Sequence, residues 1–549
     1  MASGEVPGQR IRADQRFASI AGLVRSQGDA FDSVGAIDDG EWHLTYSQLA
    51  AAMERTARAL IAAGVGPGDR VGLWAPNSAA WVVAAVGVHA CGAVLVPVNT
   101  RFKGPEAAYV LRRSGCTALF VSGEFLGVDY LSMLQEADPE LAGQLAKVVL
   151  AGSGRPGAEG PDPAPPGALG WESFLRRGSE VTGAGYADRL AAVGPDDPAD
   201  VIFTSGTTGH PKGVVLTHGQ SLRAYEAFNV GFGLRYGDRY LITNPFFHCF
   251  GYKAGWMLCL LVGATALPHA VFDAEAVLNR VERDRITVVA GPPTMFTSIL
   301  EVPDRSRHDL SSLRYAFTAA SSIPVALVRR MQAELAVEVG TGYGLTESTA
   351  VASVTRPGED AETVASTVGS AVPGVELRIV DGDHVELPAG EPGEVAIRGF
   401  NVTPGYWDDP EATATVIDGD GWLYTGDIGI LNDLGHLRIT DRKKDLFIVG
   451  GFNVSPAEVE GLLLADERLA QVAVIGIPDE RLGEVAAAFV VPRNGMQVGV
   501  ADIVASARAR MANYKVPRHV EILDALPVNA SGKVLKAELS RRAAGRTQA

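Results

Sequence analysis

The strongest constraint on the fold is an alternation of short apolar runs with helical patterns along most of the chain. Residues 70–75 and 93–98 are strand-like, whereas 79–89 and 106–113 have helical patterns. This alternation predicts right-handed βαβ units and an α/β protein built on mostly parallel, multi-sheet cores covered by helices. A length of 549 residues allows two to four domains. Further strands are predicted at residues 201–204, 240–244, 264–267, 287–290 and 315–319.

One segment, residues 81–98, resembles a membrane span in length and lack of charge. It also contains His89, Cys91 and Pro97, and neither a second span nor a basic flank accompanies it. We therefore predict a buried helix followed by a buried strand at 93–96, and no integral membrane segment.

The sequence pattern changes near residue 440. A charge cluster at 441–445 is followed by a short apolar run and by Gly450-Gly451. A capping box at Ser455–Glu458 then predicts a helix start. Strands at 472–477 and 486–491 and a helix at 503–511 complete a small α+β unit. The predicted division is a large N-terminal domain, residues 1–442, and a small C-terminal domain, residues 443–549.

Composition excludes several classes of function. Lys+Arg number 48 and Asp+Glu 64, so the formal charge is 48 − 64 = −16, which argues against a nucleic-acid partner. The four cysteines form no CxxC pair, and the N-terminus has no secretory signal pattern. We therefore predict reduced thiols and a cytoplasmic location.

The most informative motif is the string FTSGTTGHPKG at residues 203–213, which directly follows a predicted strand. Its glycines allow backbone N–H groups to converge, and its hydroxyls and lysine add further donors, a combination that suits a polyphosphate. Pro211 precedes the lysine where a Walker A loop requires glycine, so this is not a Walker A loop. The predicted phosphate-binding residues are Thr204, Ser205, Gly206, Thr207, Thr208, Gly209 and Lys212.

Four further motifs follow in order: NPFFH at 244–248, YGLTE at 343–347, YTGD at 424–427 and SGK at 531–533. Together with the 203–213 string they resemble the adenylate-forming enzymes, which include acyl-CoA synthetases, aryl-CoA ligases, firefly luciferase and peptide-synthetase adenylation domains. The resemblance spans roughly residues 20–540. It implies a large N-terminal domain and a small mobile C-terminal domain, with the active site between them.

Nucleotide-binding roles follow for several motif residues. Tyr343 offers a flat ring for adenine, and Asp427 can accept hydrogen bonds from both ribose hydroxyls. A structural tyrosine and an Asx turn are the alternative interpretations. Glu347 supplies a hard oxygen ligand for Mg²⁺, with Thr204 as a second predicted ligand and Thr346 as a phosphate-binding hydroxyl. Arg442 resembles the family's arginine that contacts ribose and phosphate.

Lys533 is the predicted catalytic lysine. Placed between a substrate carboxylate and the α-phosphate of ATP, its charge offsets the repulsion between two anions, a role shared with Lys212. The resemblance makes Lys444 the hinge about which the C-terminal domain turns. That turn would remove Lys533 and bring Gly450, Gly451 and Phe452 to the acyl-adenylate, where paired glycines let the thin pantetheine arm of CoA pass.

The acyl site is assigned by resemblance, with His248 as a catalytic residue that helps admit the carboxylate. No acid occurs in residues 244–251, which argues against an α-amino group on the substrate. The run 244–255 most resembles actinobacterial ligases that activate ring-bearing propanoates. Lys253 either meets a polar group of such a substrate or is a solvated lysine on a helix face. The predicted acyl-binding residues are His248, Phe250, Gly251, Lys253, Ala319, Ala320 and Gly342.

The predicted function is an ATP-dependent acyl-CoA synthetase that uses ATP, Mg²⁺ and coenzyme A on a hydrophobic or ring-bearing carboxylic acid, such as a steroid-derived indane propanoate or a fatty acid. An adenylating enzyme that loads a carrier-protein thiol, or stops at acyl-AMP, is the alternative. The co-occurrence of Lys212, Glu347, Asp427, Arg442 and Lys533 weighs against an inactive nucleotide-binding module. Formation of a homo-oligomer is left open.

Overall fold

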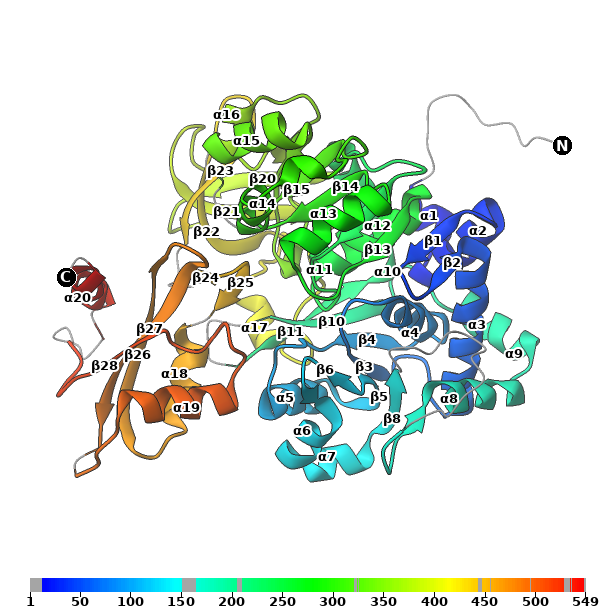
Figure 1. The fold of residues 1–549 in the computed structure, drawn as a ribbon, viewed down its shortest axis with the longest axis horizontal. Helices are drawn as coiled ribbons and strands as arrows, with labels where there is room; N and C mark the ends of the chain where they lie inside the picture. The colour runs from blue at the N-terminus through cyan, green and yellow to red at the C-terminus, as the bar shows by residue number, and fades with distance from the viewer. Residues whose placement is uncertain are drawn as a thin grey trace.

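The computed structural model shows a large N-terminal domain with a smaller C-terminal domain beside it (Figure 1). The structure describes residues 12–150, 164–204, 210–319, 323, 325–442, 447–454, 456–493, 495–527, 534 and 536–547. Two seven-stranded sheets form the framework of the N-terminal domain.

Both large sheets are parallel except at one edge pair each, β1/β2 and β10/β11. The predicted α/β class with mostly parallel sheets is therefore confirmed. The first sheet has the order β16 (Glu338–Gly340), β15 (Tyr315–Thr318), β14 (Val288–Gly291), β12 (Arg239–Ile242), β13 (Thr265–Pro268), β1 (Gly35–Asp38), β2 (His43–Thr45). The second has the order β11 (Lys212–Thr217), β10 (Pro198–Thr204), β4 (Val94–Pro97), β3 (Arg70–Trp74), β5 (Cys116–Ser122), β8 (Ala146–Leu150), β9 (Leu169–Gly170).

Helix α4 (Ala79–Ala90) lies between the two sheets (Figure 1). Every one of its residues is buried, and Ser78 caps its N-terminus by accepting a hydrogen bond from the Trp81 N–H. It shares one apolar core with strands of both sheets. A helix covered on all sides has no polar face, which explains why this segment resembles a membrane span. In the described part of the chain, no helix is both long and apolar enough to cross a bilayer.

Two smaller sheets close the N-terminal domain on the side of the C-terminal domain. One is the antiparallel sheet of β20 (Val375–Val380), β21 (Gly393–Gly399), β22 (Leu423–Leu431) and β23 (Leu437–Arg442). The other pairs β17 (Gly342–Tyr343), β18 (Ser353–Val354) and β19 (Ser370–Ala371).

The C-terminal domain has an apolar core of its own, formed by residues between Phe447 and Leu539. Its five strands are β25 (Phe452–Val454), β24 (Phe447–Val449), β27 (Gly483–Pro492), β26 (Leu469–Asp479) and β28 (His519–Ile522). Its helices are α18 (Pro456–Leu464), α19 (Val500–Arg510) and α20 (Lys536–Thr547). The predicted small α+β unit is thus present, and α20 lies on its outer side, away from the N-terminal domain (Figure 1).

Candidate active site

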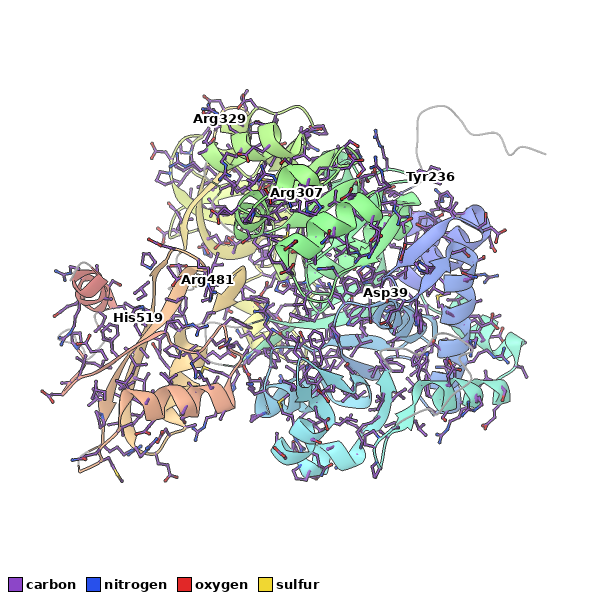
Figure 2. The ribbon with its side chains drawn as sticks, in the orientation of Figure 1. Asp39, Tyr236, Arg307, Arg329, Arg481 and His519 are labelled. Carbon is purple, nitrogen blue, oxygen red and sulfur yellow. The ribbon has the colours of Figure 1, made fainter. Side chains whose placement is uncertain are left out.

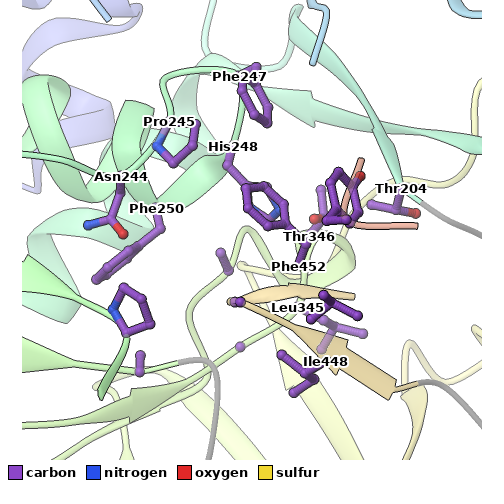
Figure 3. A pocket seen from close by; sticks show the side chains of 18 of the residues that line it. Thr204, Asn244, Pro245, Phe247, His248, Phe250, Leu345, Thr346, Ile448 and Phe452 are labelled. Atoms are coloured by element: carbon purple, nitrogen blue, oxygen red, sulfur yellow. The ribbon is translucent and has the colours of Figure 1, made fainter. Parts of the chain in front are cut away.

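A cavity of about 2080 Å³ lies between the two domains. Residues from the ends of β10, β12, β15 and β17, from β22 and from the β24–β25 turn line it. Figure 3 shows His248 pointing toward the middle of this pocket, with Asn244 and Phe250 on one side and Thr204 and Thr346 on the other. The cavity therefore brings together three of the motifs found in the sequence.

The two flanks of the predicted phosphate motif lie on paired strands. Thr204 ends β10, Lys212 begins β11, and the two are direct partners in the antiparallel register. Both line the cavity. The Lys212 ammonium lies 5.0 Å from the centre of the Tyr406 ring, and the Tyr406 hydroxyl donates a hydrogen bond to Glu347 Oε1 at 2.8 Å. A cation and a carboxylate thus face the same space.

Glu347 lies in a short 3₁₀ turn, Thr346–Ser348, just after β17. Burial raises the pKa of Glu347, and the hydrogen bond from Tyr406 and the charge of Lys212 offset part of this shift. Among the described residues, no group of three or more acidic, histidine or cysteine side chains is arranged so that it could hold a metal ion by itself. One carboxylate beside the Thr204 and Thr346 hydroxyls nevertheless fits Mg²⁺, which keeps water ligands and takes most of its other ligands from substrate phosphates.

Tyr343 and Asp427 form a further part of the cavity wall. The Tyr343 hydroxyl donates to Asp427 Oδ2 at 2.6 Å, and both residues line the cavity. Asp427 is the register partner of Arg442 across β22 and β23. The predicted adenine-stacking ring and ribose acceptor are therefore neighbours, as one nucleoside requires.

His248 separates the nucleotide side of the cavity from an apolar side. Its imidazole is open to the cavity, and the surrounding protein lowers its pKa by desolvation. A neutral imidazole can donate a single hydrogen bond to a carboxylate without neutralising it by an ion pair. Beyond it the apolar wall includes Phe228, Phe250, Ala254, Met295, Phe317, Ala319 and Gly342.

The C-terminal domain contributes a two-residue turn between β24 and β25. Val449 and Phe452 are register partners, and Gly450 and Gly451 both have positive φ, 55° and 86°. Such a turn requires glycine or asparagine, because a Cβ is disfavoured at both positions. Gly450, Gly451 and Phe452 line the cavity, and a Cβ on Gly451 would lie 3.7 Å from Pro292 of the N-terminal domain.

Two parts of the sequence match known protein families. Residues 25–407 match the AMP-binding enzyme family, and residues 458–533 match the AMP-binding enzyme C-terminal domain. The chain belongs to the AMP-binding enzyme family. Since this family model covers more than half of the chain, the resemblance found in the motifs is confirmed.

Individual relatives of this AMP-binding enzyme are similar over nearly their whole length. The 3-[(3aS,4S,7aS)-7a-methyl-1,5-dioxo-octahydro-1H-inden-4-yl]propanoyl:CoA ligase of Rhodococcus jostii is 48% identical, covering 92% of this chain and 95% of the relative. The ligase of the same name from Mycobacterium tuberculosis is 47% identical, covering 90% and 93%. The solved o-succinylbenzoate CoA synthetase (MenE) of Bacillus subtilis, bound with a product analogue, has a TM-score of 0.77 at 26% identity, covering 95% of this chain and 98% of that one.

The structure corrects two acyl-site assignments. Lys253 neither lines the cavity nor reaches solvent: it is fully buried, and its ammonium contacts Asp200 Oδ2 and Ser221 Oγ at 2.5 Å each. Both sequence-based interpretations of Lys253 are therefore wrong, because an acid 53 residues earlier in the chain neutralises it inside the core. Gly251 is also absent from the lining, since a Cβ there would meet the Asn244 and Pro245 carbonyls at 2.2 and 2.3 Å.

Several predicted site residues lie outside the described residues, so their roles stay predictions. They are Ser205, Gly206, Thr207, Thr208, Gly209, Ala320, Lys444 and Lys533. Of Arg442, the structure gives the backbone pairing with Asp427. The other predicted residues of the nucleotide side line the same cavity, namely Thr204, Lys212, Tyr343, Thr346, Glu347 and Asp427.

Some residues of the site were not found from the sequence. Tyr406, which holds Glu347, lies in a PGYW run at 404–407 that has no recognisable pattern of its own. A group of basic residues at the C-terminal side of the cavity was also missed, since its members come from distant parts of both domains. They are Arg101, Lys103, Arg481, Arg508 and Arg518.

Proposed function

We propose that this AMP-binding enzyme activates a hydrophobic, ring-bearing propanoic acid as its CoA thioester. It is an acid–thiol ligase that uses ATP, Mg²⁺ and CoA. The acid carboxylate attacks the α-phosphorus of ATP, giving acyl-AMP and pyrophosphate. The CoA thiolate then attacks the acyl carbonyl and AMP leaves. No side-chain nucleophile is required, because the mixed anhydride is itself the activated species.

One observation supports this proposal above the others. A single cavity connects a nucleotide wall (Tyr343, Asp427), an apolar chamber behind His248, and a glycine turn supplied by the C-terminal domain. ATP and then CoA must each reach the carboxyl group of the acid, and this arrangement provides a separate approach for each. Mg²⁺, when bound near Glu347, would supply charge neutralisation at the phosphates.

The protein groups have distinct tasks in the first step. The neutral His248 orients the carboxylate while leaving its charge free for attack. Lys212 stabilises the negative charge on the phosphates, and Asp427 with Tyr343 fixes the nucleoside so that the α-phosphorus faces the acid. We infer that Lys533 contributes the remaining positive charge.

The apolar chamber is what relates the site to ring-bearing acids. Its wall is built of phenylalanine, alanine and methionine side chains and lies next to a histidine that can hold the carboxylate. A bicyclic propanoate, the type of acid named for the 48% identical ligase, offers apolar rings with a short acid arm, which matches that order. A free α-ammonium would have no acid partner in residues 244–251.

The test is a panel of acids in a pyrophosphate-release assay followed by detection of the thioester. We expect bicyclic indane propanoates to give the highest kcat/KM, medium-chain fatty acids to follow, and α-amino acids to give no turnover. Acyl-CoA and AMP should form in equal amounts. The proposal would be refuted if none of the organic acids in the panel caused pyrophosphate release.

An enzyme that loads a carrier-protein thiol, or stops at acyl-AMP, remains the second candidate. It differs in one measurable respect: free CoA would not accelerate AMP release. Rapid AMP release with CoA and a thioester product would exclude it.

The basic residues that line the cavity suggest where the phosphates of CoA bind. Arg481, Arg508 and Arg518 come from the C-terminal domain, and Arg101 and Lys103 from the N-terminal domain. Arg481 lies on the part of the C-terminal domain that is next to the N-terminal domain, whereas His519 lies farther out (Figure 2). In a protein of net charge −16, positively charged side chains on the cavity wall are what can attract a polyanionic thiol.

Replacing both Arg481 and Arg518 by glutamine is expected to raise KM for CoA by at least about tenfold, since each charged hydrogen bond is worth roughly 1.5–3 kcal/mol. KM for dephospho-CoA should rise less, because one phosphate is already missing. Steady-state assays with both thiols give the comparison. Arg468→Gln is the control, because this arginine pairs with Asp466 inside the C-terminal domain. An equal rise for both thiols would count against phosphate recognition here.

We also propose a domain boundary at residues 442/443 and a cytoplasmic location. The separate apolar core that begins at Phe447 supports the first. The second is supported by the four cysteines, which are all buried as free thiols: Cys91, Cys116, Cys249 and Cys259.

A further inference from the structure

A buried ion cluster joins the two domains next to the active-site cavity. The ammonium of Lys515 lies 2.8 Å from Glu106 Oε1 and 2.7 Å from Glu458 Oε1. Lys515 is 1% exposed, Glu106 8% and Glu458 4%. Lys515 and Glu458 belong to the C-terminal domain, whereas Glu106 lies on α5 (Gly104–Ser114) of the N-terminal domain.

Aromatic and polar contacts surround this cluster. The Lys515 ammonium lies 4.6 Å from the centre of the Phe102 ring. Tyr514 stacks on Phe452 with ring centres 4.5 Å apart, and its hydroxyl accepts a hydrogen bond from Asn99 Nδ2 at 3.2 Å. The segment that carries Lys515 is therefore bound both to the N-terminal domain and to the β24–β25 turn.

Arg101 extends these contacts, since its guanidinium lies 4.4 Å from the centre of the Phe452 ring. Phe452 directly follows Gly450 and Gly451, which line the cavity. The position of the glycine turn over the cavity is thus coupled, through Phe452 and Tyr514, to the position of Lys515.

The ionisation states of Lys515 and Glu106 determine the effect of this cluster on the two domains. Burial alone would lower the pKa of Lys515, but Tyr514 and the two carboxylates raise it, so the lysine stays charged. Burial raises the pKa of Glu106, and Lys515 offsets part of that shift. A buried ion pair contributes little net stability, yet it penalises any arrangement that buries one partner without the other. A buried ion pair between two domains therefore favours one relative orientation of the domains, although it adds little to the affinity between them.

We propose that Lys515 and Glu106 are positioning residues that hold the C-terminal domain in the orientation in which thioester formation takes place. This inference rests on the proposed function. Glu458 moves with Lys515, so of the two carboxylates only Glu106 changes its distance to Lys515 when the orientation of the domains changes. When the C-terminal domain turns for adenylation, the Lys515–Glu106 contact opens and both groups become hydrated.

The decisive variant is Glu106→Gln. Glu106 Oε2 accepts a hydrogen bond from the Lys103 N–H at the start of α5, and the glutamine amide oxygen can retain that bond. The charge opposite Lys515 is lost without disturbing the C-terminal domain. The matched control is Glu460→Gln, because Glu460 bonds Val474 N and pairs with Lys536 inside the C-terminal domain.

The two half-reactions are then measured separately. We expect Glu106→Gln to slow thioester formation from supplied acyl-adenylate and CoA by about 10- to 100-fold, because the glycine turn is no longer held in place. Pyrophosphate exchange with acid and ATP should stay the same or rise. Lys515→Met should give the same pattern, and the double variant should be no worse than Lys515→Met. Glu460→Gln should change neither half-reaction.

A distance measurement tests the orientation directly. Spin labels at cysteines replacing Arg307 and His519, which are exposed on the two domains (Figure 2), should give one main distance in the parent protein and a second population with Glu106→Gln. An equal loss of both half-reactions, no loss of either, or an unchanged distance distribution would overturn the inference. If the parent protein exchanges no pyrophosphate with any acid, the proposed function fails first and the inference falls with it.

Discussion

Replacing Lys253 with methionine is expected to destabilise the protein by about 3–5 kcal/mol, the usual cost of leaving one member of a buried ion pair alone. Lys253 and its partner Asp200 are both fully buried, in a π-helical turn (Tyr252–Met257) and in β10 respectively. The methionine fills a similar volume, so the loss comes from the uncompensated carboxylate and not from a void.

In the parent protein, neither nearby histidine shares the task of neutralising Asp200. His89 lies 3.8 Å from Asp200 Oδ1, but burial and the charge of Lys253 lower its pKa to about 3. His218, which packs edge-on against His89, also has its pKa lowered by burial, with the charge of His89 the next cause. Both histidines are therefore neutral at pH 7, and Lys253 is the cation that neutralises Asp200.

Urea unfolding followed by tryptophan fluorescence measures this effect, since Trp256 stacks on Tyr252 at 4.8 Å. The double variant Lys253→Met/Asp200→Asn should be more stable than Lys253→Met, because both charges are removed. In the folded fraction, activity toward ketone-bearing and ketone-free acids should change in parallel, as Lys253 is absent from the cavity lining. A selective loss for ketone-bearing acids would instead restore the substrate contact proposed from the sequence.

The fold was predictable because its signals are local. The alternation of strand and helix patterns indicates which segments are buried on both faces. The strand predicted at 240–244 is β12 (Arg239–Ile242), and the strand predicted at 287–290 is β14 (Val288–Gly291). The apolar segment that imitates a membrane span is α4. The residues of the nucleotide wall were expected for a similar reason, because each belongs to a motif of a few consecutive residues: Tyr343 ends β17, and Asp427 lies within β22.

The remaining features depend on partners far apart in the chain. A lysine in the sequence gives no sign of burial unless its acid is known, and Asp200 precedes Lys253 by 53 residues. The Lys515–Glu106 contact joins residues 409 positions apart. Neither ion pair is marked by a sequence motif, because the two charged residues of each pair come together only when the chain folds. The acyl side was predicted less well because Gly251 packs on the backbone of the nearby Asn244 and Pro245 and does not face the cavity.

Replacing Lys533 with alanine is expected to have the largest effect on catalysis. Adenylation should fall by about 100- to 1000-fold or more, the loss typical when one preorganised charge stabiliser is removed. The reason is electrostatic: the carboxylate and the triphosphate repel each other increasingly as they approach, and a cation between them cancels that rise. Pyrophosphate exchange measures this step, whereas thioester formation from supplied acyl-adenylate should be unchanged.

The expected selectivity for adenylation follows from the two orientations of the C-terminal domain. Helix α20 starts three residues after Lys533 and lies on the outer side of the domain, away from the cavity (Figure 1). In the two alternating orientations that the family resemblance implies, the domain turns when Lys533 acts, and this movement takes the glycine turn out of the cavity. Lys536→Ala is the matched control, because Lys536 pairs with Glu460 within the domain, and it should leave both steps intact. Lys533→Ala and Glu106→Gln should thus impair opposite halves of one reaction, and a Lys533→Ala variant that loses both halves equally would contradict two alternating orientations.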